Sequence, residues 1–223
     1  MVPRCMAFGT RDFGSNLSVV LLHDILQVMS RSERVRVQSV EVLSDDWYAL
    51  QKTTFEYLRR DGTWQTLSRE TYDRGNGAVV LLYNREARTV VLTRQFRYPA
   101  YVNGLADGLL MEACAGLLDN DAPDACIQRE AAEETGFRIG NPKRVFEAYM
   151  SPGSVTEKLY FYVAEYWHHQ RAGAGGGDHS EGEDIEVVEL AFDRALEMVA
   201  RGEIMDGKTI MLLLYAQTAG LLC

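Results

Sequence analysis

A run of acidic residues in the middle of the chain is the pattern with the clearest chemical meaning. It reads Arg129-Glu130-Ala131-Ala132-Glu133-Glu134-Thr135-Gly136-Phe137. On a helix, Glu130 and Glu134 stand four residues apart and share one face, with Glu133 beside them. Like charges at this spacing destabilise a helix by about 0.2–0.5 kcal/mol per pair. A divalent cation turns that repulsion into attraction, and oxygen-only ligands favour Mg²⁺ ahead of Ca²⁺ or Mn²⁺. A solvated acidic face is the alternative interpretation.

The residues around this run predict the elements that would position it. Residues 115–119 lead from an apolar strand into a turn. Asp121 suits the N-cap of a helix and Pro123 suits its first turn. Gly136 suits the left-handed residue that ends a helix. A strand, a glycine turn and an acidic helix in this order favour a metal site over a solvated face.

Together these residues resemble the signature of the Nudix hydrolases. That signature is Gly, five residues, Glu, seven residues, and then Arg-Glu-apolar-any-Glu-Glu-any-Gly-apolar. Every fixed position from Arg129 to Phe137 agrees with it. The spacing from Gly116 to Arg129 is one residue shorter than usual, so Ala122 or Asp121 stands at the loop glutamate, depending on the direction of counting. The shortened loop resembles the GDP-mannose pyrophosphatase branch of the family.

Four further stretches resemble the same branch and extend the likeness from about residue 33 to residue 218. They are Asp73-Arg74-Gly75-Asn76-Gly77-Ala78, Arg94-Gln95-Phe96-Arg97, Tyr149-Met150-Ser151-Pro152-Gly153 and Asp206-Gly207-Lys208-Thr209. The resemblance implies an α+β Nudix fold, with mixed β-sheets sandwiched between helices and an N-terminal antiparallel β-hairpin subdomain. We expect residues 1–32 to be an extension, disordered or helical, residues 33–74 to form the subdomain and to dimerise the protein, and residues 75–223 to form the Nudix hydrolase domain.

The resemblance also implies which residues hold the metal and act in catalysis. The implied ligands are the backbone oxygen of Ala115 and the carboxylates of Glu130, Glu134 and Glu183. Glu133 joins the acidic catalytic set, either as a ligand through water or as a nearby acceptor. Arg129 is expected to orient these carboxylates, or else to form a simple pair with Glu133 one turn along the helix.

Substrate contacts are implied at positions outside the acidic run. Trp47 stands where the resembling enzymes place a tyrosine against the base, and an indole can stack there as well. Arg97 is expected to fork onto a diphosphate oxygen, with an ordinary surface arginine as the alternative. Glu157 matches the position that meets the sugar, although nearby Ser154 replaces the usual glycine. The full implied substrate-binding set is Trp47, Ser68, Arg69, Glu70, Arg97, Ala115, Gly116, Leu117, Glu134, Glu157 and Glu183.

Hydrophobic periodicity predicts the remaining elements. Strands are expected at 35–42, 78–83, 89–96, 109–114, 144–149 and 159–165, with a hairpin formed by 47–58 and 63–72 about the turn Arg60-Asp61-Gly62. Helices are expected at 194–201, capped by Asp193 and stopped by Gly202, and at 208–219. Residues 171–182 contain five glycines and almost no apolar side chains, so we expect them to form an unpacked, mobile loop. Such a loop would act as a lid that delivers Glu183, Asp184 and Glu186.

Composition limits the classes of function. A chain of 223 residues, 47% of them hydrophobic, can bury one substantial core beside an N-terminal appendage. The net charge of −9 argues against a nucleic-acid groove. Cys5, Cys114, Cys126 and Cys223 are scattered, which indicates reduced thiols in a cytoplasmic protein. Residues 19–29 are too short to span a membrane and include His23 and Asp24. Met29 offers an alternative start of translation.

The resemblance implies Mg²⁺-dependent hydrolysis of the pyrophosphate bond of GDP-mannose or a related nucleoside diphosphate sugar, with Mn²⁺ as another usable ion. The products would be a nucleoside monophosphate and a sugar 1-phosphate. Hydrolysis of ADP-ribose, or of many nucleotide sugars, is the nearest alternative. A Nudix protein that binds a nucleotide as a sensor without hydrolysing it is an alternative of another class, but it would have no need of all three helix carboxylates. A prenyl diphosphate isomerase is disfavoured, because it would need a cysteine poised opposite an acid.

Overall fold

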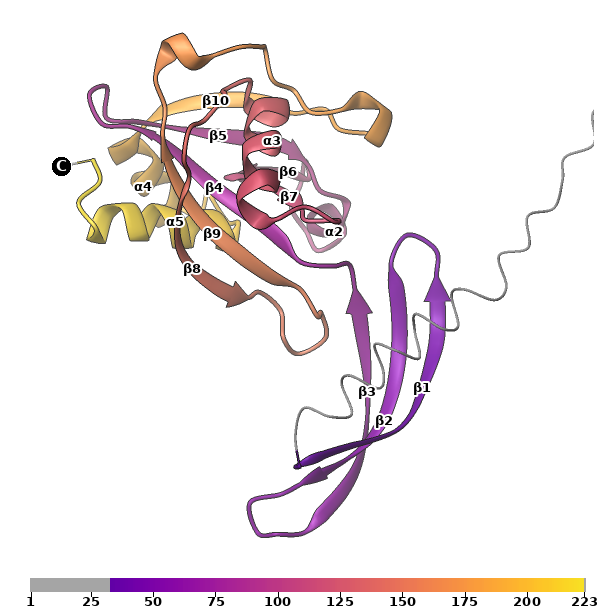
Figure 1. The fold of residues 1–223 in the computed structure, drawn as a ribbon. Coiled ribbons are helices and arrows are strands. Elements are labelled where there is room, and N and C mark those ends of the chain that lie inside the picture. The colour runs from indigo at the N-terminus through magenta and orange to yellow at the C-terminus, as the bar shows by residue number, and fades with distance from the viewer. Residues whose placement is uncertain (1–32, 223) are drawn as a thin grey trace, which may run out of the picture. The chain divides into compact units, whose positions relative to one another are not determined.

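The chain forms two compact units that divide between Tyr72 and Asp73, close to the expected boundary after residue 74 (Figure 1). The computed structural model describes residues 33–222. The expected extension, residues 1–32, and with it the predictions for residues 19–29 and Met29, lies outside the described residues.

The N-terminal unit is a three-stranded sheet in the order β1-β2-β3. Its strands are β1 (Val35–Asp45), β2 (Ala49–Leu58) and β3 (Trp64–Asp73). The predicted hairpin turn is confirmed, because Arg59 N–H donates to the Thr63 carbonyl at 2.8 Å and the Asp61 side chain accepts from Thr63 N–H at 3.0 Å. None of residues 33–72 is buried, so this sheet has no core of its own.

The second unit is built on one mixed sheet of seven strands. Five strands lie in the order β10-β5-β4-β9-β8, while β6 pairs with β5 and β7 pairs with β4. The strands are β4 (Gly77–Asn84), β5 (Thr89–Phe96), β6 (Leu109–Glu112), β7 (Cys114–Leu117), β8 (Lys143–Tyr149), β9 (Lys158–Glu165) and β10 (Glu186–Ala191). β4 and β9 run parallel, and the other pairs are antiparallel.

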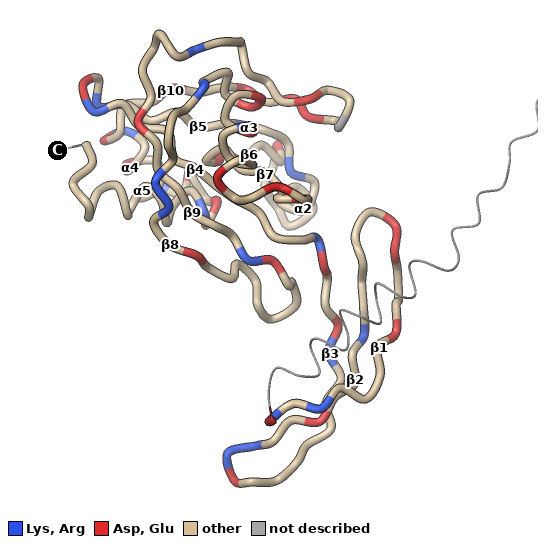
Figure 2. Tube along the Cα trace, viewed as in Figure 1, with Lys and Arg blue, Asp and Glu red and all other residues tan. Residues whose placement is uncertain are grey.

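Helices complete this unit. They are α2 (Tyr98–Val102), α3 (Pro123–Thr135), α4 (Phe192–Ala200) and α5 (Gly207–Thr218), with short 3₁₀ helices η1 (His168–Gln170) and η2 (His179–Glu181). Among the described residues, no helix has both the length and the apolar character that crossing a bilayer requires. Along the described trace, Lys and Arg are interspersed with Asp and Glu (Figure 2).

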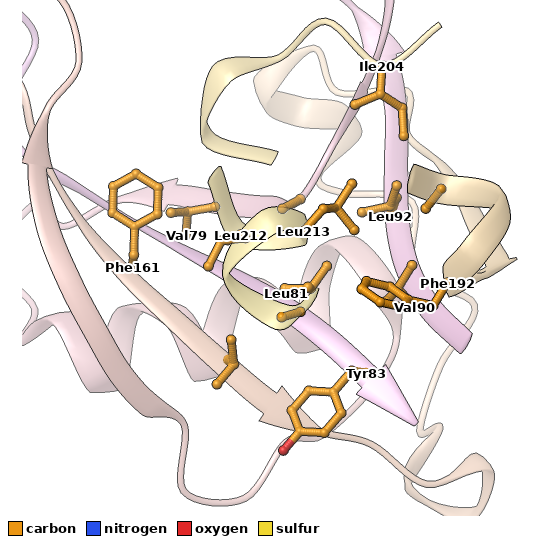
Figure 3. Packing of buried hydrophobic residues seen from close by; sticks show 14 of the residues in the cluster. Val79, Leu81, Tyr83, Val90, Leu92, Phe161, Phe192, Ile204, Leu212 and Leu213 are labelled. Carbon is orange, nitrogen blue, oxygen red and sulfur yellow. The ribbon is translucent and has the colours of Figure 1, made fainter. Parts of the chain in front are cut away.

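The core lies on both faces of β4, whose eight residues are all buried. Successive side chains of a strand point to opposite faces. Val79, Leu81 and Tyr83 therefore pack with residues of α4 and α5 such as Phe192 and Leu212 (Figure 3). Ala78, Val80 and Leu82 pack on the other face with Cys126, Ile127 and Ala131 of α3. The expected α+β fold, with a mixed sheet between helices, is confirmed.

Helix ends differ from the prediction in two places. α3 has Ala122 rather than Asp121 at its N-cap, and no side chain caps it. α4 begins before Asp193, which lies in its first turn and not at its cap. The predicted stop of α3 is confirmed, because Gly136 is left-handed with φ 77°. The N-cap of α5 is Asp206, whose side chain accepts from Thr209 N–H at 3.0 Å.

The strand predicted over 109–114 is two strands with different partners. β6 ends at Glu112 and pairs with β5, whereas β7 begins at Cys114 and pairs with β4. Between them the Ala113 N–H donates to the side-chain oxygen of Thr209 at 2.6 Å, and so it bonds to α5 instead of a neighbouring strand. Periodicity did not reveal this break, because the partner lies far away in the sequence.

The prediction that residues 171–182 do not pack is wrong. Ala172 N–H donates to the Gly136 carbonyl at 2.8 Å, and Gly176 N–H donates to the Glu134 carbonyl at 2.9 Å. The segment therefore lies against the C-terminal end of α3. It packs through its backbone, which requires no apolar side chains.

Candidate active site

Two glutamates of α3 face the backbone of β7. Glu130 and Glu134 lie one turn apart on the helix, as the sequence predicted. Glu134 is only 2% exposed, and its Oε2 accepts a hydrogen bond from Ala115 N–H at 3.2 Å. The candidate catalytic residue Glu134 thus connects β7, the strand of the signature, directly to the acidic helix α3.

Gly116 allows this close approach. A Cβ placed on Gly116 would overlap the carboxyl group of Glu130. Any larger residue at this position would displace that carboxylate from the strand. The glycine that opens the signature is therefore needed for space, and it belongs to the same site as Glu130.

The carbonyl of Ala115 points toward the same helix. The N–H and C=O of one strand residue lie on the same side of the strand. Ala115 N–H is directed at Glu134, so the Ala115 carbonyl also faces α3 and not β4. The carbonyl of Leu117, two residues further on, faces α3 too and accepts from the Cys126 thiol at 3.2 Å. The predicted backbone ligand is thus oriented toward the predicted carboxylate ligands.

Burial and mutual repulsion raise the pKa values of Glu130 and Glu134. Burial, followed by the nearby charges of Glu130 and Glu183, raises the pKa of Glu134 to about 8. Burial also raises the pKa of Glu130 to about 7, with Glu133 and Glu183 adding to the effect and Arg129 opposing it. A carboxylate group that resists ionisation is one that a divalent cation would stabilise strongly.

Arg129 makes both of the contacts that the sequence left open. Its guanidinium lies 2.9 Å from Glu130 and 3.1 Å from Glu133, and 3.5 Å from Asp121 in the preceding loop. Burial alone would lower the pKa of Arg129, but the charges of Glu130 and Glu133 outweigh it and raise the pKa. Arg129 thus orients two carboxylates and forms the pair along the helix as well.

The donor set fits a hard divalent cation, although the side chains are not gathered into a complete cage. Carboxylate and carbonyl oxygens are the ligands that Mg²⁺ prefers. Within residues 33–222, no three His, Cys, Asp or Glu side chains are close enough to hold a metal ion by themselves. The Oε2 of Glu183 accepts a hydrogen bond from Asp178 N–H at 2.9 Å. Carboxylates that bind a metal are commonly hydrogen-bonded themselves, so this contact leaves Glu183 able to bind a cation through its other oxygen.

Part of the Arg97 guanidinium is bonded to a buried carboxylate, although the side chain is 42% exposed. Its Nε and Nη2 donate to the two carboxylate oxygens of Glu112 at 2.6 and 3.2 Å. Glu112 is 2% exposed and also pairs with Lys208, which lies 2.9 Å from Asp206. Burial would raise the pKa of Glu112, but Lys208 and Arg97 outweigh it and hold that pKa low. The two bonds to Glu112 use two of the five guanidinium N–H groups, so the expected contact to a diphosphate could be made by the others without replacing the contact to Glu112.

Glu157 lies beside a cavity next to the signature loop. Its carboxylate is 3.4 Å from Nε of Arg74. Arg74 helps to line a cavity of about 390 Å³ whose walls combine polar and apolar groups. The other lining residues are Gly75, Asn76, Leu117, Leu118, Asp119, Asn120 and Asp121. The structure thus brings the residue expected to meet the sugar close to a space that begins at the signature strand.

Comparison with known proteins identifies the family. The family model of the NUDIX domain matches residues 73–206, which is more than half of the chain. The chain belongs to the Nudix family. A second model, described as the GDP-mannose pyrophosphatase NudK N-terminal domain, matches residues 34–72.

Several relatives of this Nudix protein are named GDP-mannose pyrophosphatase. The relative from Enterobacter sp. (strain 638) is 54% identical over 191 residues, covering 86% of this chain and 99% of the relative. The relative from Klebsiella pneumoniae subsp. pneumoniae is 54% identical, covering 86% and 96%. The relative from Escherichia coli (strain K12) is 52% identical, covering 86% and 99%. The predicted resemblance is confirmed over both units.

Four expected substrate contacts lie in the other unit of this Nudix protein. Trp47 precedes β2 and is 82% exposed, and its ring stacks on Tyr48 with centroids 6.0 Å apart. The Ser68 hydroxyl on β3 is 2.9 Å from that of Thr54, and Arg69 donates to the Ser68 carbonyl at 2.8 Å. Glu70 is exposed on the same strand. These four residues belong to the N-terminal unit, whereas the Nudix carboxylates belong to the second unit.

Sequence analysis gave no role to several residues that hold the Nudix site in place. Glu112 and Lys208 are buried charges that anchor Arg97, and Thr209 fixes the strand break before β7. Burial, with Glu134 next to it, raises the pKa of the Cys114 thiol well above its ordinary value. Asp206, an N-cap residue three positions before Thr209, is a local sequence signal that could have predicted the start of α5. The pairing of Glu112 left no such signal, because its partners are distant in sequence.

Proposed function

We propose that this protein is a Mg²⁺-dependent pyrophosphatase that hydrolyses GDP-mannose or a closely related nucleoside diphosphate sugar. The products are a nucleoside monophosphate and a sugar 1-phosphate, and Mn²⁺ can replace Mg²⁺. The observation that carries the proposal is the pair of buried carboxylates, Glu130 and Glu134, facing the backbone of Ala115 and Gly116. The names of the relatives support the choice of substrate.

In this proposal, the Ala115 carbonyl, Glu130, Glu134 and Glu183 hold the cation. When bound, the cation supplies charge neutralisation at the diphosphate oxygens and makes a water more acidic. Glu133 lies at the exposed side of the group, where it can act through water, and Arg129 keeps Glu130 and Glu133 in place.

A carboxylate of the protein accepts the proton that the reaction releases. Hydrolysis breaks one P–O bond of the P–O–P bridge, the oxygen of water joins that phosphorus, and the bridging oxygen stays with the other phosphate. The attacking water gives its proton to a carboxylate, from which it passes to solvent. Glu133 is the candidate for that base, because Glu130, Glu134 and Glu183 hold the cation in this proposal.

Substrate recognition in this proposal uses both units. Trp47 stacks on the base, and Ser68, Arg69 and Glu70 contact the nucleotide. Gly116 and Leu117 border the diphosphate, and Arg97 contributes to its charge balance. Glu157 meets the sugar beside the cavity bordered by Arg74, which residues of the signature loop also line.

We propose further that residues 33–74 dimerise the protein and that residues 75–223 form the catalytic domain of a cytoplasmic enzyme. The absence of any buried residue between 33 and 72 supports the first point, because an isolated small sheet is at best marginally stable. The unpaired positions of the four cysteines in the sequence support a reducing compartment.

A substrate panel tests the proposed reaction. Purified protein with Mg²⁺ is incubated with GDP-mannose, GDP-glucose, ADP-ribose and UDP-glucose in ¹⁸O-enriched water, and the products are separated and weighed. We expect GMP and mannose 1-phosphate to form fastest, with ¹⁸O in only one of them. Faster release of AMP from ADP-ribose would favour the alternative substrate, and tight binding without any release would favour a sensor.

A further inference from the structure

The glycine-rich loop is bonded to the end of the acidic helix. The last carbonyls of a helix have no partner within it. Here loop amides serve them: Gly176 N–H donates to the Glu134 carbonyl at 2.9 Å and Gly177 N–H donates to the Glu133 carbonyl at 3.2 Å. The residues whose side chains form the metal site therefore also anchor the loop through their backbone.

The approach of the two backbones is too close for side chains. A Cβ on Gly175 would lie 2.5 Å from the Glu134 carbonyl oxygen and 2.7 Å from the carbonyl carbon of Thr135. These are backbone atoms of α3, which cannot move aside. The loop thus lies at a fixed distance from the helix.

The same loop then fixes the carboxylate of Glu183. Gly177 has φ 76°, and a Cβ there would overlap Oε2 of Glu183 and lie 2.8 Å from its Cβ. The carboxylate occupies the space over Gly177 and accepts from Asp178 N–H at 2.9 Å. The two ends of this loop segment are also joined, because Ile185 N–H donates to the Gly176 carbonyl at 3.2 Å.

We propose that Gly177 and the backbone amide of Asp178 are positioning groups that hold Glu183 at a fixed place relative to Glu130 and Glu134. The loop is fixed to the C-terminal end of α3 and positions Glu183 there, so it is not the independent lid that the sequence predicted. This inference rests on the proposed function, since it takes Glu183 to serve the metal site. Glu183 is among the charges that raise the pKa of both Glu130 and Glu134, which agrees with its closeness to them.

Alanine at Gly177 tests the proposal. In Gly177→Ala the new Cβ displaces the Glu183 carboxylate, and we expect Mn²⁺ affinity, measured from the free-ion EPR signal, to fall about tenfold or more. Gly182→Ala is the matched control, because Gly182 has φ 81° but nothing within 4 Å of an added Cβ. Both variants suffer the same backbone strain, so only Gly177→Ala should lose metal affinity. Equal affinities in the two variants would overturn the proposal.

A double-mutant cycle separates positioning from general damage. If Gly177 acts through Glu183, then Gly177→Ala adds no further loss of Mn²⁺ affinity in a Glu183→Gln background. Additive losses in the cycle would mean that Gly177 serves the fold and not Glu183. If Glu183→Gln leaves affinity unchanged while Glu134→Gln abolishes it, the metal site stands and the positioning role is disproved. Unchanged affinity in Glu134→Gln would instead refute the proposed function.

A second pair of variants keeps the test decisive if Gly177→Ala does not fold. Asp178→Pro removes the amide that donates to Glu183, and Asp178→Ala keeps that amide while removing the same side chain. We expect Mn²⁺ affinity to be at least several-fold lower in Asp178→Pro than in Asp178→Ala. Matching affinities in this pair would count against the role of the amide.

Discussion

At the scale of single residues, the central question is how two buried glutamates share one small volume. Two contacts favour the ionised forms of these carboxyl groups: Ala115 N–H donates to Glu134, and Arg129 pairs with Glu130. Neither contact overcomes burial, so both carboxyls keep raised pKa values. A bound cation would lower the free-energy cost of ionising Glu130 and Glu134. Metal binding is therefore coupled to the release of protons from these two carboxyl groups.

Glu134→Gln should separate catalysis from folding. The variant loses one ligand charge but keeps the shape of the side chain, so we expect turnover to fall on the order of 100-fold or more while the fold persists. Steady-state rates and circular dichroism check both expectations. Glu197→Gln, an exposed glutamate on α4, is the control and should keep the parent's rate. Parent-like turnover in Glu134→Gln would refute the metal assignment.

The raised pKa values predict an unusual pH dependence of stability without metal. The folded-state pKa of Glu134, about 8, lies above the ordinary glutamate value of about 4.5. Its contribution to stability is therefore full below pH 4.5 and is lost as the pH rises through 8. We expect the Tm of EDTA-treated protein to fall between pH 5 and 8.5, and the Tm of Mg²⁺-loaded protein to fall less. The slope should flatten in Glu134→Gln, and an unchanged slope there would assign the effect to other groups.

Arg97→Ala should affect both binding and stability. Removing the guanidinium leaves buried Glu112 with Lys208 as its remaining cationic partner, at a cost of about 1–3 kcal/mol. If Arg97 also meets the diphosphate, KM for the substrate rises while kcat changes less. Thermal melting and steady-state kinetics measure the two effects independently. A lower Tm with an unchanged KM would make Arg97 a purely structural residue.

At the scale of elements, the site depends on how closely α3 approaches β7. Gly116 sets this distance, because an added Cβ would overlap the carboxyl group of Glu130. We expect Gly116→Ala to cost about 1–3 kcal/mol through overpacking and to weaken Mn²⁺ binding as Glu130 moves. Gly140→Ala is the control, since nothing lies within 4 Å of a Cβ there. Equal Mn²⁺ affinities in these two variants would show that the helix can shift without harm.

Elements with a strong local pattern were predictable, and contacts between distant segments were not. The spacing of Glu130 and Glu134, the stop at Gly136 and the apolar run of β4 all follow from neighbouring residues, and the structure confirms them. The packing of residues 171–182 on α3 is made by backbone groups, which leave no side-chain pattern to read. The pairing of Arg97 with Glu112 likewise depends on two strands meeting, so spacing along the chain could not reveal it.

At the scale of the whole molecule, the two units differ in how they are stabilised. Both hydrophobic clusters lie in the second unit, on the two faces of its sheet. In the N-terminal unit, no residue from 33 to 72 is buried, and Val42, Leu43 and Trp47 are large exposed apolar side chains. A three-stranded sheet needs a hydrophobic face or a packing partner for independent stability, and these exposed apolar side chains favour a partner. A second copy of the chain is the partner that we propose.

Residues 1–28 should be dispensable under this division. They precede the matched N-terminal domain, which begins at residue 34, and no proposed site residue lies among them. We expect the protein that starts at Met29 to keep the parent's turnover and Tm. An inactive or insoluble product would show that the N-terminal arm completes the fold.

The dimer proposal is tested by separating the units. The full chain should have twice the mass of one chain by light scattering. Residues 73–223 alone should be monomeric and folded, because their core is self-contained. Turnover of GDP-mannose should nevertheless be lost in this fragment, since Trp47, Ser68, Arg69 and Glu70 are removed with the sheet, while Mn²⁺ binding should persist at Glu130 and Glu134. A monomeric full chain would refute dimerisation, and full turnover by the fragment would remove the N-terminal residues from the active site.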